Sequence, residues 1–242
     1  MTEQTIRIAS YDVLPDGTLK PSALQRYCQQ AALEDVAAVG ATYRTMRERS
    51  MVFVLMRLSA EFRLPVFSND EVLLRTHAYK CDGVMFYRAF ELYRAGELCA
   101  AVDTRWVLID FEKRTLLRPT QYVFPIRETQ PEAELPHIER RVVLTGCDRK
   151  TVRNVRLTEM DENRHLNNCV YSDWALDDAP LDLENGRVKY LCIHFEHEAH
   201  WKDEIELSFQ REEKNGCLMQ AFNKTTGQVC FAAVLRTEPK GN

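Results

Sequence analysis

Hydrophobic and polar residues follow the same order of patterns twice along the 242-residue chain. Each half begins with a short alternating run, continues with a helical pattern, and ends with four alternating runs that predict strands. In the first half the alternating runs are Thr5–Tyr11, Met51–Leu64, Glu71–Cys81, Met85–Arg94 and Leu98–Phe111. In the second half they are Lys150–Thr158 and residues 187–200, 203–212, 216–224 and 228–237. This order predicts an α+β protein with one helix packed on each of two antiparallel sheets.

A helix is predicted near the start of each half. In the first half, Pro21 suits the first turn of the helix and Gly40 suits its end. The apolar residues of this segment recur at helical spacing and are mostly small: Leu24, Tyr27, Cys28, Ala31, Ala32, Val36 and Val39. In the second half, the helix begins near Asn167 and ends before Pro180. The two helix starts are about 147 residues apart, which is typical of duplicated domains rather than of short repeats.

Residues 112–147 interrupt these patterns. They contain four prolines, at positions 119, 125, 131 and 136, together with many charged side chains. We therefore expect a first domain at residues 1–115, a connector at 116–147 and a second domain at 148–242.

Composition and charge exclude some classes of partner. Hydrophobic residues make up 45% and charged residues 28% of the chain, which is ordinary for a globular protein. A net charge of −4 gives no overall attraction for nucleic acid or for an anionic membrane. An acidic partner would have to meet a local basic cluster, such as Arg140–Arg141 and Arg149–Arg156. A solvated strand edge protected by basic side chains is the alternative interpretation of these residues, and we favour it.

The eight cysteines and the N-terminal segment favour a cytoplasmic location. The cysteines lack a C-x-x-C pair and lie mostly in apolar runs, as expected for buried thiols in a reducing compartment. The first residues pass directly into a strand pattern without the features of a signal or transit peptide. No apolar run approaches the length of a membrane span, and no glycine-rich nucleotide motif is present, so we expect no cofactor.

Polar side chains are most concentrated between residues 161 and 168. Asp161, Asn163 and His165 are spaced by two, so an extended loop would place all three on one face. Asn167 or Asn168 can then cap a helix. That helix has an apolar face predicted from the spacing of Tyr171, Trp174 and Ala175.

This position gives the polar residues a possible chemical role. The positive end of a helix disfavours protonation of His165, and a neutral imidazole can act as a base. With Asn163 to position water and Asp161 to orient the ring or balance charge, the group has the parts needed to hydrolyse an ester-like bond. The alternative is that these are ordinary turn and cap residues beside a loop histidine, and spacing alone does not separate the two interpretations.

The segment DENRHLNNCVYSDW resembles the D-x-N-x-H-x-N-N-x-x-Y-x-x-W signature of the acyl-(acyl carrier protein) thioesterases. Phe53–Val72 is similar to the first long strand and hairpin of that family, and LQRYCQQAALEDVAAVG to its first long helix. The resemblance implies a double hot-dog fold, with two antiparallel sheets each wrapped around a helix. It also implies hydrolysis of fatty acyl-ACP thioesters to free fatty acid and holo-ACP.

The resemblance assigns a role to a second segment, LCIHFEHEAHW, whose alternation predicts a half-buried strand. Glu198 matches the glutamate of the family's catalytic network, whereas Ala199 stands where plant members often have cysteine. Water is then the expected attacking group, activated by His165 or Glu198, and which of these is the base stays open. Without the resemblance, Glu198 would be interpreted as a solvated carboxylate.

Three histidines in the same segment also suggest a metal site. His194, His197 and His200 are spaced by three, which in a strand places His197 on the face opposite the other two. They cannot converge on one ion without a bend, so we expect no metal.

The first half lacks comparable chemistry at the start of its helix, where Asp12 and Asp16 occur without a histidine or an Asn-Asn pair. We therefore expect catalysis in the second half and an acyl-chain pocket in the first. Its expected lining is Ala32, Val36, Val39 and Phe53. Ordinary core packing is the alternative for this stripe, and it carries the greater weight.

Several functional alternatives remain open. The expected partner is an acyl carrier protein with a phosphopantetheine-linked acyl chain, and an acyl-CoA thioesterase is the nearest alternative. A 3-hydroxyacyl thioester dehydratase and a non-catalytic acyl-binding module could use the same fold. The sequence leaves open the length and unsaturation of the acyl chain, and whether the chain forms a homodimer.

Overall fold

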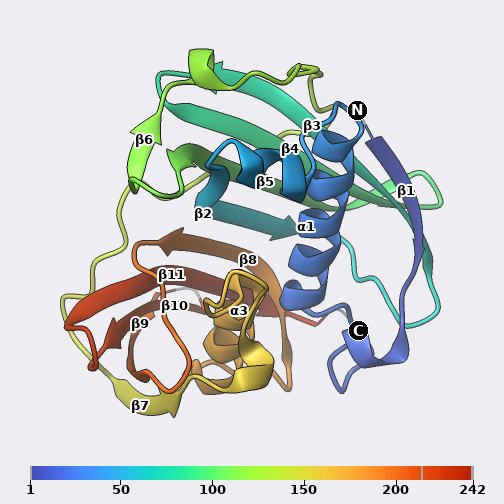
Figure 1. Cartoon of the computed structure of the whole chain (residues 1–242). Helices are drawn as coiled ribbons and strands as arrows, with labels where there is room; N and C mark the ends of the chain where they lie inside the picture. The colour runs from blue at the N-terminus through green and yellow to red at the C-terminus, as the bar shows by residue number, and fades with distance from the viewer. Residues whose placement is uncertain (1, 214, 241–242) are drawn as a thin grey trace. The chain divides into compact units, whose positions relative to one another are not determined.

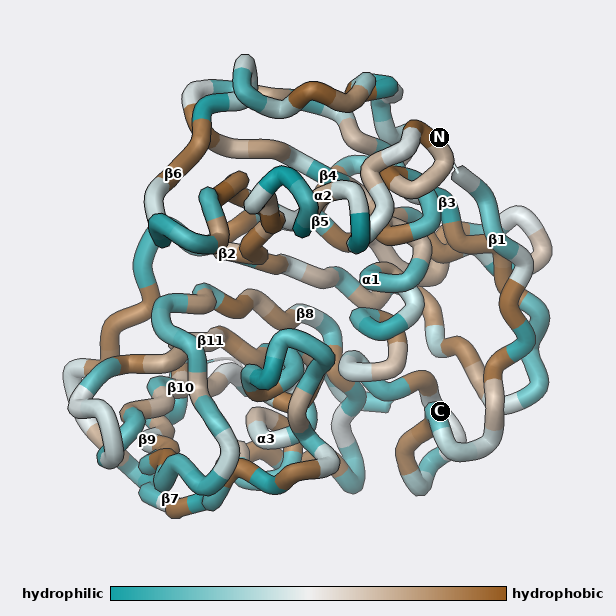
Figure 2. Tube along the Cα trace, viewed as in Figure 1, coloured by the Kyte–Doolittle hydropathy of each residue, from teal (hydrophilic) through white to brown (hydrophobic). Residues whose placement is uncertain are grey.

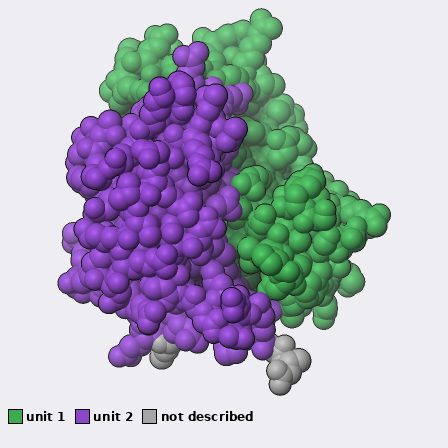
Figure 3. Space-filling model, turned by 90° about the horizontal axis from the view of Figure 1, so that it is seen from below, with its two compact units in different colours: residues 1–137 green, residues 138–242 purple. Residues whose placement is uncertain are grey.

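The computed structural model describes residues 2–213 and 215–240. The chain divides into two compact units, Met1–His137 and Ile138–Asn242 (Figures 1 and 3). The division therefore falls inside the proline-rich stretch at residues 112–147. Within the described residues, no helix is long and apolar enough to cross a membrane.

The first unit is an antiparallel sheet with strand order β1-β3-β4-β5-β2, in which β6 pairs with β5. Its strands are β1 (Thr2–Arg7), β2 (Met51–Phe62), β3 (Glu71–Asp82), β4 (Met85–Arg94), β5 (Glu97–Asp110) and β6 (Thr115–Leu117). Its helices are α1 (Pro21–Ala37) and α2 (Tyr43–Glu48), with short 3-10 turns at Ser10–Asp12 and Pro119–Gln121. Helix α1 packs against β3 and β1 (Figure 1).

The second unit is an antiparallel sheet with strand order β8-β11-β10-β9-β7. Its strands are β7 (Arg149–Asn154), β8 (Gly186–Phe195), β9 (Glu204–Glu212), β10 (Gly216–Asn223) and β11 (Gln228–Pro239). A 3-10 turn at Leu157–Glu159 precedes helix α3 (Asn168–Asp178), which contacts β11. Each unit thus combines antiparallel strands with helices packed on them, which confirms the α+β class.

Local sequence signals explain the hairpin between β3 and β4. Asp82 and Gly83 form the predicted hairpin turn between β3 and β4, with Asp82 opposite Met85 and Gly83 at φ +61°. Along β9, buried and less buried residues alternate, so one face of that strand is in the core. Hydrophobic residues recur along the strands of both units (Figure 2).

Three strand predictions are wrong in their end points: Thr5–Tyr11, because β1 ends at Arg7, Lys150–Thr158, because β7 ends at Asn154, and the run at 187–200. The alternating pattern predicts a strand from 187 to 200, but β8 ends at Phe195. The N–H groups of Glu196 and His197 both donate to the carbonyl oxygen of Cys230, at 2.8 and 3.1 Å. Two residues therefore face one on the neighbouring strand, and regular pairing stops there.

Helix α3 is held on its sheet by aromatic contacts. The ring centroid of Tyr171 lies 4.3 Å from that of Phe231 on β11 and 5.9 Å from that of Phe195 on β8. Tyr171, Trp174 and Ala175 are all buried, as their helical spacing predicts. Burying large aromatic side chains contributes strongly to such packing, so the position of α3 on this sheet is well fixed.

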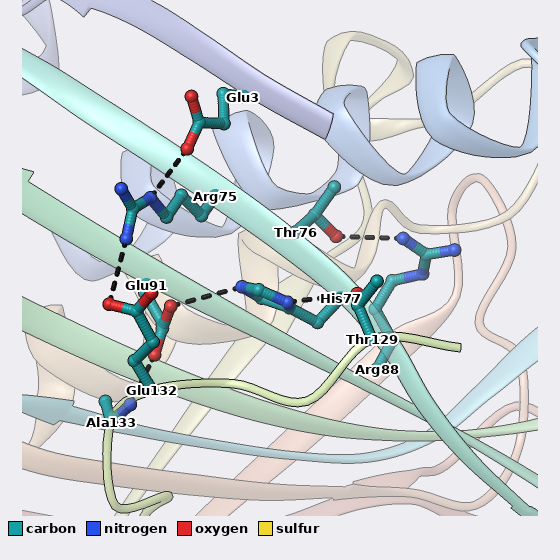
Figure 4. A network of polar contacts seen from close by, with 9 residues as sticks. All are labelled: Glu3, Arg75, Thr76, His77, Arg88, Glu91, Thr129, Glu132 and Ala133. Atoms are coloured by element: carbon teal, nitrogen blue, oxygen red, sulfur yellow. Dashed lines mark hydrogen bonds and ion pairs between the residues drawn. The ribbon is translucent and has the colours of Figure 1, made fainter. Parts of the chain in front are cut away.

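A buried polar network holds part of the proline-rich stretch on the first sheet (Figure 4). Nε2 of His77 lies 3.1 Å from Oε2 of Glu91, and Nδ1 of His77 lies 3.1 Å from Oγ1 of Thr129. The N–H of Ala133 donates to the other oxygen of Glu91. The side chains of His77 and Glu91 are only 2% and 0% exposed, so their polar atoms depend on these partners.

Candidate active site

The candidate site begins with a closed turn before helix α3. The N–H of Asp161 donates to the carbonyl of His165 at 2.8 Å, and Arg164 has a left-handed φ of 66°. Oδ1 of Asp161 accepts from the N–H groups of Asn163 and His165 at 2.9 and 3.1 Å. The expected extended loop is therefore wrong, because the Asp161 carboxylate satisfies the backbone of a tight turn.

The turn still separates half-buried from exposed side chains as the spacing predicts. Asp161, Asn163 and His165 are half-buried, whereas Glu162 and Arg164 are exposed. The Asp161 carboxylate thus binds the backbone that carries Asn163 and His165.

Helix α3 starts directly after this turn. The side-chain oxygen of Asn167 accepts from the N–H of Cys169 at 2.9 Å, which confirms the predicted cap. The N–H of Leu166 donates to the carbonyl of Ala199 at 2.8 Å, which joins the turn to the segment after β8. Two segments that are distant in sequence therefore meet at one end of α3.

This junction brings His165 and Glu198 together. Nε2 of His165 lies 3.2 Å from Oε2 of Glu198, and the two side chains are 19% and 38% exposed. At this distance a proton can lie between the nitrogen and the carboxylate oxygen. Such a pair can accept and return a proton as one unit. Ala199 is buried beside it and supplies no nucleophile.

His200 is a further residue of the site, and sequence reasoning did not place it there. Its ring lies edge-on to that of His165, with centroids 5.1 Å apart at an interplanar angle of 85°. His194 is buried on β8, and Nδ1 of His197 lies 2.8 Å from the carbonyl oxygen of Val229. The bend after Phe195 therefore takes His200 to His165 instead of to the other two histidines.

Tyr171 is buried in the aromatic contacts of α3. Burial raises the pKa of its hydroxyl group, and the nearby acidic groups of Cys230, Glu198, Asp203 and Asp161 raise it further. Tyr171 therefore stays protonated at neutral pH and is not a candidate base.

The first unit contains the same turn without the same chemistry. The N–H of Leu14 donates to the carbonyl of Thr18 at 2.7 Å, as Asp161 does to His165. Val13 and Leu19 form a bridge, as Met160 and Leu166 do. The offset is again 147 residues, which agrees with the duplication inferred from the two helix starts. In this copy, Thr18 stands where the second unit has His165.

The second segment of the site is duplicated as well. The N–H of Leu19 donates to the carbonyl of Val66 at 2.8 Å, as Leu166 does to Ala199. The position equivalent to Glu198 is therefore Pro65, and the position equivalent to His200 is Phe67. The first unit keeps the backbone of the site but has neither its imidazoles nor its glutamate.

The expected lining residues of the first unit are all half-buried: Ala32, Val36, Val39 and Phe53. Val36 and Phe53 pack against one cluster built around Ala41, Met46, Phe86 and Leu108. The ring centroid of Phe53 lies 5.0 Å from that of Phe86 and 5.3 Å from that of Tyr122. Val36 and Phe53 thus share one cluster that contains several aromatic side chains.

The expected basic cluster on β7 is largely neutralised by neighbouring carboxylates. Nε of Arg153 lies 2.6 Å from Asp178, and Nζ of Lys150 lies 2.7 Å from Glu206. Arg140, Arg141 and Arg156 are exposed. The charge of the β7 strand is thus smaller than its sequence suggests.

Both units match known protein families. Residues 1–124 match the family described as acyl-ACP thioesterase N-terminal domain. Residues 147–235 match the family described as acyl-ACP thioesterase C-terminal domain. The resemblance inferred from the segment at 161–174 is therefore confirmed.

Curated relatives share a low identity over most of the chain. An oleoyl-acyl carrier protein thioesterase of Arabidopsis thaliana is 23% identical over 245 residues, covering 91% of this chain and 64% of the relative. An acyl-[acyl-carrier-protein] hydrolase of Cuphea viscosissima is 23% identical over 226 residues, covering 84% of this chain and 53% of the relative. The chain thus spans less than two thirds of the length of these relatives.

Solved structures share the fold over nearly the whole chain. An acyl-ACP thioesterase from Bacteroides thetaiotaomicron aligns with a TM-score of 0.84 at 16% identity, covering 98% of this chain and 97% of the other. The 12:0-ACP thioesterase from Umbellularia californica aligns with a TM-score of 0.83 at 18% identity, covering 99% and 97%. These alignments confirm the double hot-dog fold.

Proposed function

Because the chain belongs to the acyl-ACP thioesterase family, we propose that it hydrolyses fatty acyl-ACP thioesters to free fatty acid and holo-ACP. The observation that carries the proposal is the contact of 3.2 Å between His165 and Glu198 at the start of α3. Residues 148–242 would hold the catalytic groups, and residues 1–115 would bind the acyl chain, with 116–147 as the connector.

In the proposed reaction, a water oxygen attacks the thioester carbonyl carbon and one water proton passes to Glu198. Glu198 is the more exposed member of the pair, which supports it as the acceptor. The tetrahedral intermediate then collapses, the carbon–sulfur bond breaks, and the pair returns the proton to the departing sulfur. The products are a carboxylic acid and the thiol of the carrier.

Three neighbouring groups would assist this reaction. His165 would share a proton with Glu198, 3.2 Å away, and so hold the carboxylate in place. The Asn163 amide would position the attacking water, and Asp161 keeps both residues in their turn. The positive end of α3 would favour the negative charge that develops on the carbonyl oxygen.

The carrier and the location are also proposals. The exposed side chains of Arg140, Arg141 and Arg156 would meet an acidic carrier protein and its phosphopantetheine phosphate. A cytoplasmic location is supported by eight cysteine thiols, six of them buried.

For the acyl chain, we propose that Ala32, Val36, Val39 and Phe53 line its binding site. Two of them, Val36 and Phe53, pack against an apolar cluster that includes Phe86, which supports contact with an alkyl chain. The ion pair between Asp35 and Arg88, at 2.8 Å, adds charged groups to the same region.

The experiment compares saturated acyl-ACP with acyl-CoA of the same chain length and measures fatty acid and thiol together. The proposal requires equal amounts of both products, and faster turnover of the ACP substrate. Glu198→Gln should lower the rate about 10²–10⁴-fold. Glu196→Gln is the matched control, because Glu196 is exposed two residues away. Retention of the acyl chain without release of thiol would instead identify a binding module, and the proposal would fail.

A further inference from the structure

Three potential metal ligands meet at the candidate site. One ligand atom from each of His165, Glu198 and His200 lies within 4.8 Å of the other two. They come from two segments that are joined by the hydrogen bond from Leu166 to Ala199. This backbone contact assembles the group before any ion binds.

One of the three ligand–ligand distances is already close to that expected for a small divalent cation of the zinc class. Zinc binds imidazole nitrogen and carboxylate oxygen at about 2.0–2.2 Å, so tetrahedral geometry places two such ligand atoms about 3.3–3.6 Å apart. Nε2 of His165 and Oε2 of Glu198 are already 3.2 Å apart. The His200 side chain is 53% exposed, so its ring can make the remaining small movement. Two imidazoles favour zinc over magnesium or calcium, which prefer oxygen ligands.

The buried carboxylate of Asp203 lies near the ring of His200. Nδ1 of His200 lies 3.9 Å from Oδ2 of Asp203, which is itself held by the N–H of His200 and by the amide of Asn223. Metal-binding histidines commonly donate their second ring nitrogen to such a carboxylate. A small ring rotation would let Nδ1 donate to Asp203 while the other nitrogen binds an ion.

The duplicated turn in the first unit provides an internal comparison. Its backbone hydrogen bonds are the same, and Asp70 accepts from the N–H of Phe67 as Asp203 does from His200. Its residues at the three ligand positions are Thr18, Pro65 and Phe67. Duplication of the backbone alone therefore does not explain the three ligands of the second unit.

We propose that His165, Glu198 and His200 form a binding site for a zinc-class divalent cation, and that the bound ion inhibits thioester hydrolysis. The inhibition rests on the proposed function, because binding would occupy the imidazole and the carboxylate that handle the water proton. The binding itself is independent of that function.

Binding is tested first without substrate. The full chain is stripped with a chelator, dialysed, and titrated with Zn²⁺ by calorimetry and with Co²⁺ by visible absorption. One ion should bind per chain. His200→Ala should weaken binding at least about 100-fold, since loss of an outer partner alone costs about 10–100-fold. His200→Gln repeats the test with a side chain of similar size, and thermal unfolding checks that both variants are folded.

Two controls separate this site from other zinc ligands. His197→Ala removes an exposed histidine three residues away and should bind zinc as the unchanged protein does. Cys147→Ser removes the exposed thiol and should also leave binding unchanged. The proposal is overturned if the unchanged protein binds no tighter than His200→Ala, or if either control loses affinity to the same extent.

Inhibition is then measured as fatty acid release, because the thiol product itself binds zinc. Each protein is compared with its own rate in chelator. Half-inhibition of His200→Ala should need at least about tenfold more zinc than the unchanged protein or His197→Ala. Zinc that binds the cluster without inhibiting, or that raises the rate, would overturn the inhibitory role. Failure of the proposed function would show separately, as no hydrolysis in chelator.

Discussion

Nε2 of His165 lies 3.2 Å from Oε2 of Glu198, although the two residues are 33 positions apart in the chain. The hydrogen bond from Leu166 to the carbonyl of Ala199, at 2.8 Å, lies one residue beyond each partner. This backbone bond holds the two segments together beside the pair. The contact thus belongs to the junction between the turn before α3 and the segment after β8.

Replacing Asn163 should impair hydrolysis without unfolding the protein. Asn163→Ala removes the proposed water-positioning amide from a half-buried turn and leaves the Asp161 hydrogen bonds to backbone N–H groups in place. We expect kcat to fall about 10²-fold or more, with thermal unfolding within a few degrees of the unchanged protein. Glu162→Ala, at an exposed position in the same turn, should keep its activity. A rate near normal for Asn163→Ala would remove this residue from the mechanism.

Thiol alkylation under native conditions should leave hydrolysis largely intact. Burial raises the pKa of Cys217 and of Cys230 to about 12, so both remain poorly reactive thiols at neutral pH. Cys147 is exposed and should react first, with activity changing by no more than about twofold. Mass spectrometry maps the modified residues against remaining activity. An acyl group trapped covalently on Cys169 or Cys192 after rapid quenching would contradict attack by water.

Enlarging the proposed acyl-chain wall should shorten the preferred substrate. Val36 packs against the cluster that contains Phe86 and Met46, so Val36→Trp would fill space beside α1. Each methylene excluded from burial forfeits about 0.8 kcal/mol, so rates on long chains should fall most while short chains are still hydrolysed. Ala32→Phe should act in the same direction, and the exposed Leu33→Trp is the control. The measurement is the rate of hydrolysis across a series of acyl-chain lengths, together with the melting temperature of each variant. Equal loss at all lengths with lower stability would indicate core overpacking instead.

Removing the charge of Asp35 should destabilise the first unit in a pH-dependent way. Burial alone would raise the pKa of Asp35, but the hydrogen bond from Thr2 and the Arg88 guanidinium together lower it. A lowered folded-state pKa stabilises the protein fully above the unfolded value of about 3.9, and this stabilisation is lost as pH falls through the folded value. Asp35→Asn should therefore cost about 1–3 kcal/mol of unfolding free energy at pH 7 and progressively less below about pH 4.

The matched control for this prediction is Glu48→Gln. Glu48 forms an exposed ion pair with Arg44 at 2.9 Å, and exposed pairs contribute less than about 1 kcal/mol. Denaturant unfolding at pH 7 and at low pH compares both variants with the unchanged protein. A pH-independent loss for Asp35→Asn would contradict the assigned charge interaction.

Local sequence signals predicted the parts of the fold that depend on residues close together in the sequence. Strand β4 runs from Met85 to Arg94 as predicted, because turn residues bound it on both sides. Asn167 caps α3 as its residue type and position suggested. The family resemblance supplied what spacing alone did not, namely the place of Glu198 beside the polar turn.

Other features depend on contacts that a local pattern does not contain. The end of β8 at Phe195 follows from two N–H groups sharing the carbonyl of Cys230 on another strand. That bend takes His200 to His165. A prediction based on a regular strand therefore grouped His200 with His194 and His197 instead of with His165. The short helix α2 and strand β6 were also missed, because segments of six and three residues are too short to show a period.

The most direct test of the central claim is a double-mutant cycle on His165 and Glu198. It measures kcat/KM for acyl-ACP hydrolysis in the unchanged protein, His165→Ala, Glu198→Gln and the double variant, all confirmed as folded by thermal unfolding. If the two side chains handle the proton as one unit, each single change should cost about 10²–10⁴-fold, and the double variant should lose little more than the worse single variant. Losses that multiply, or a single variant with a nearly normal rate, would contradict the account.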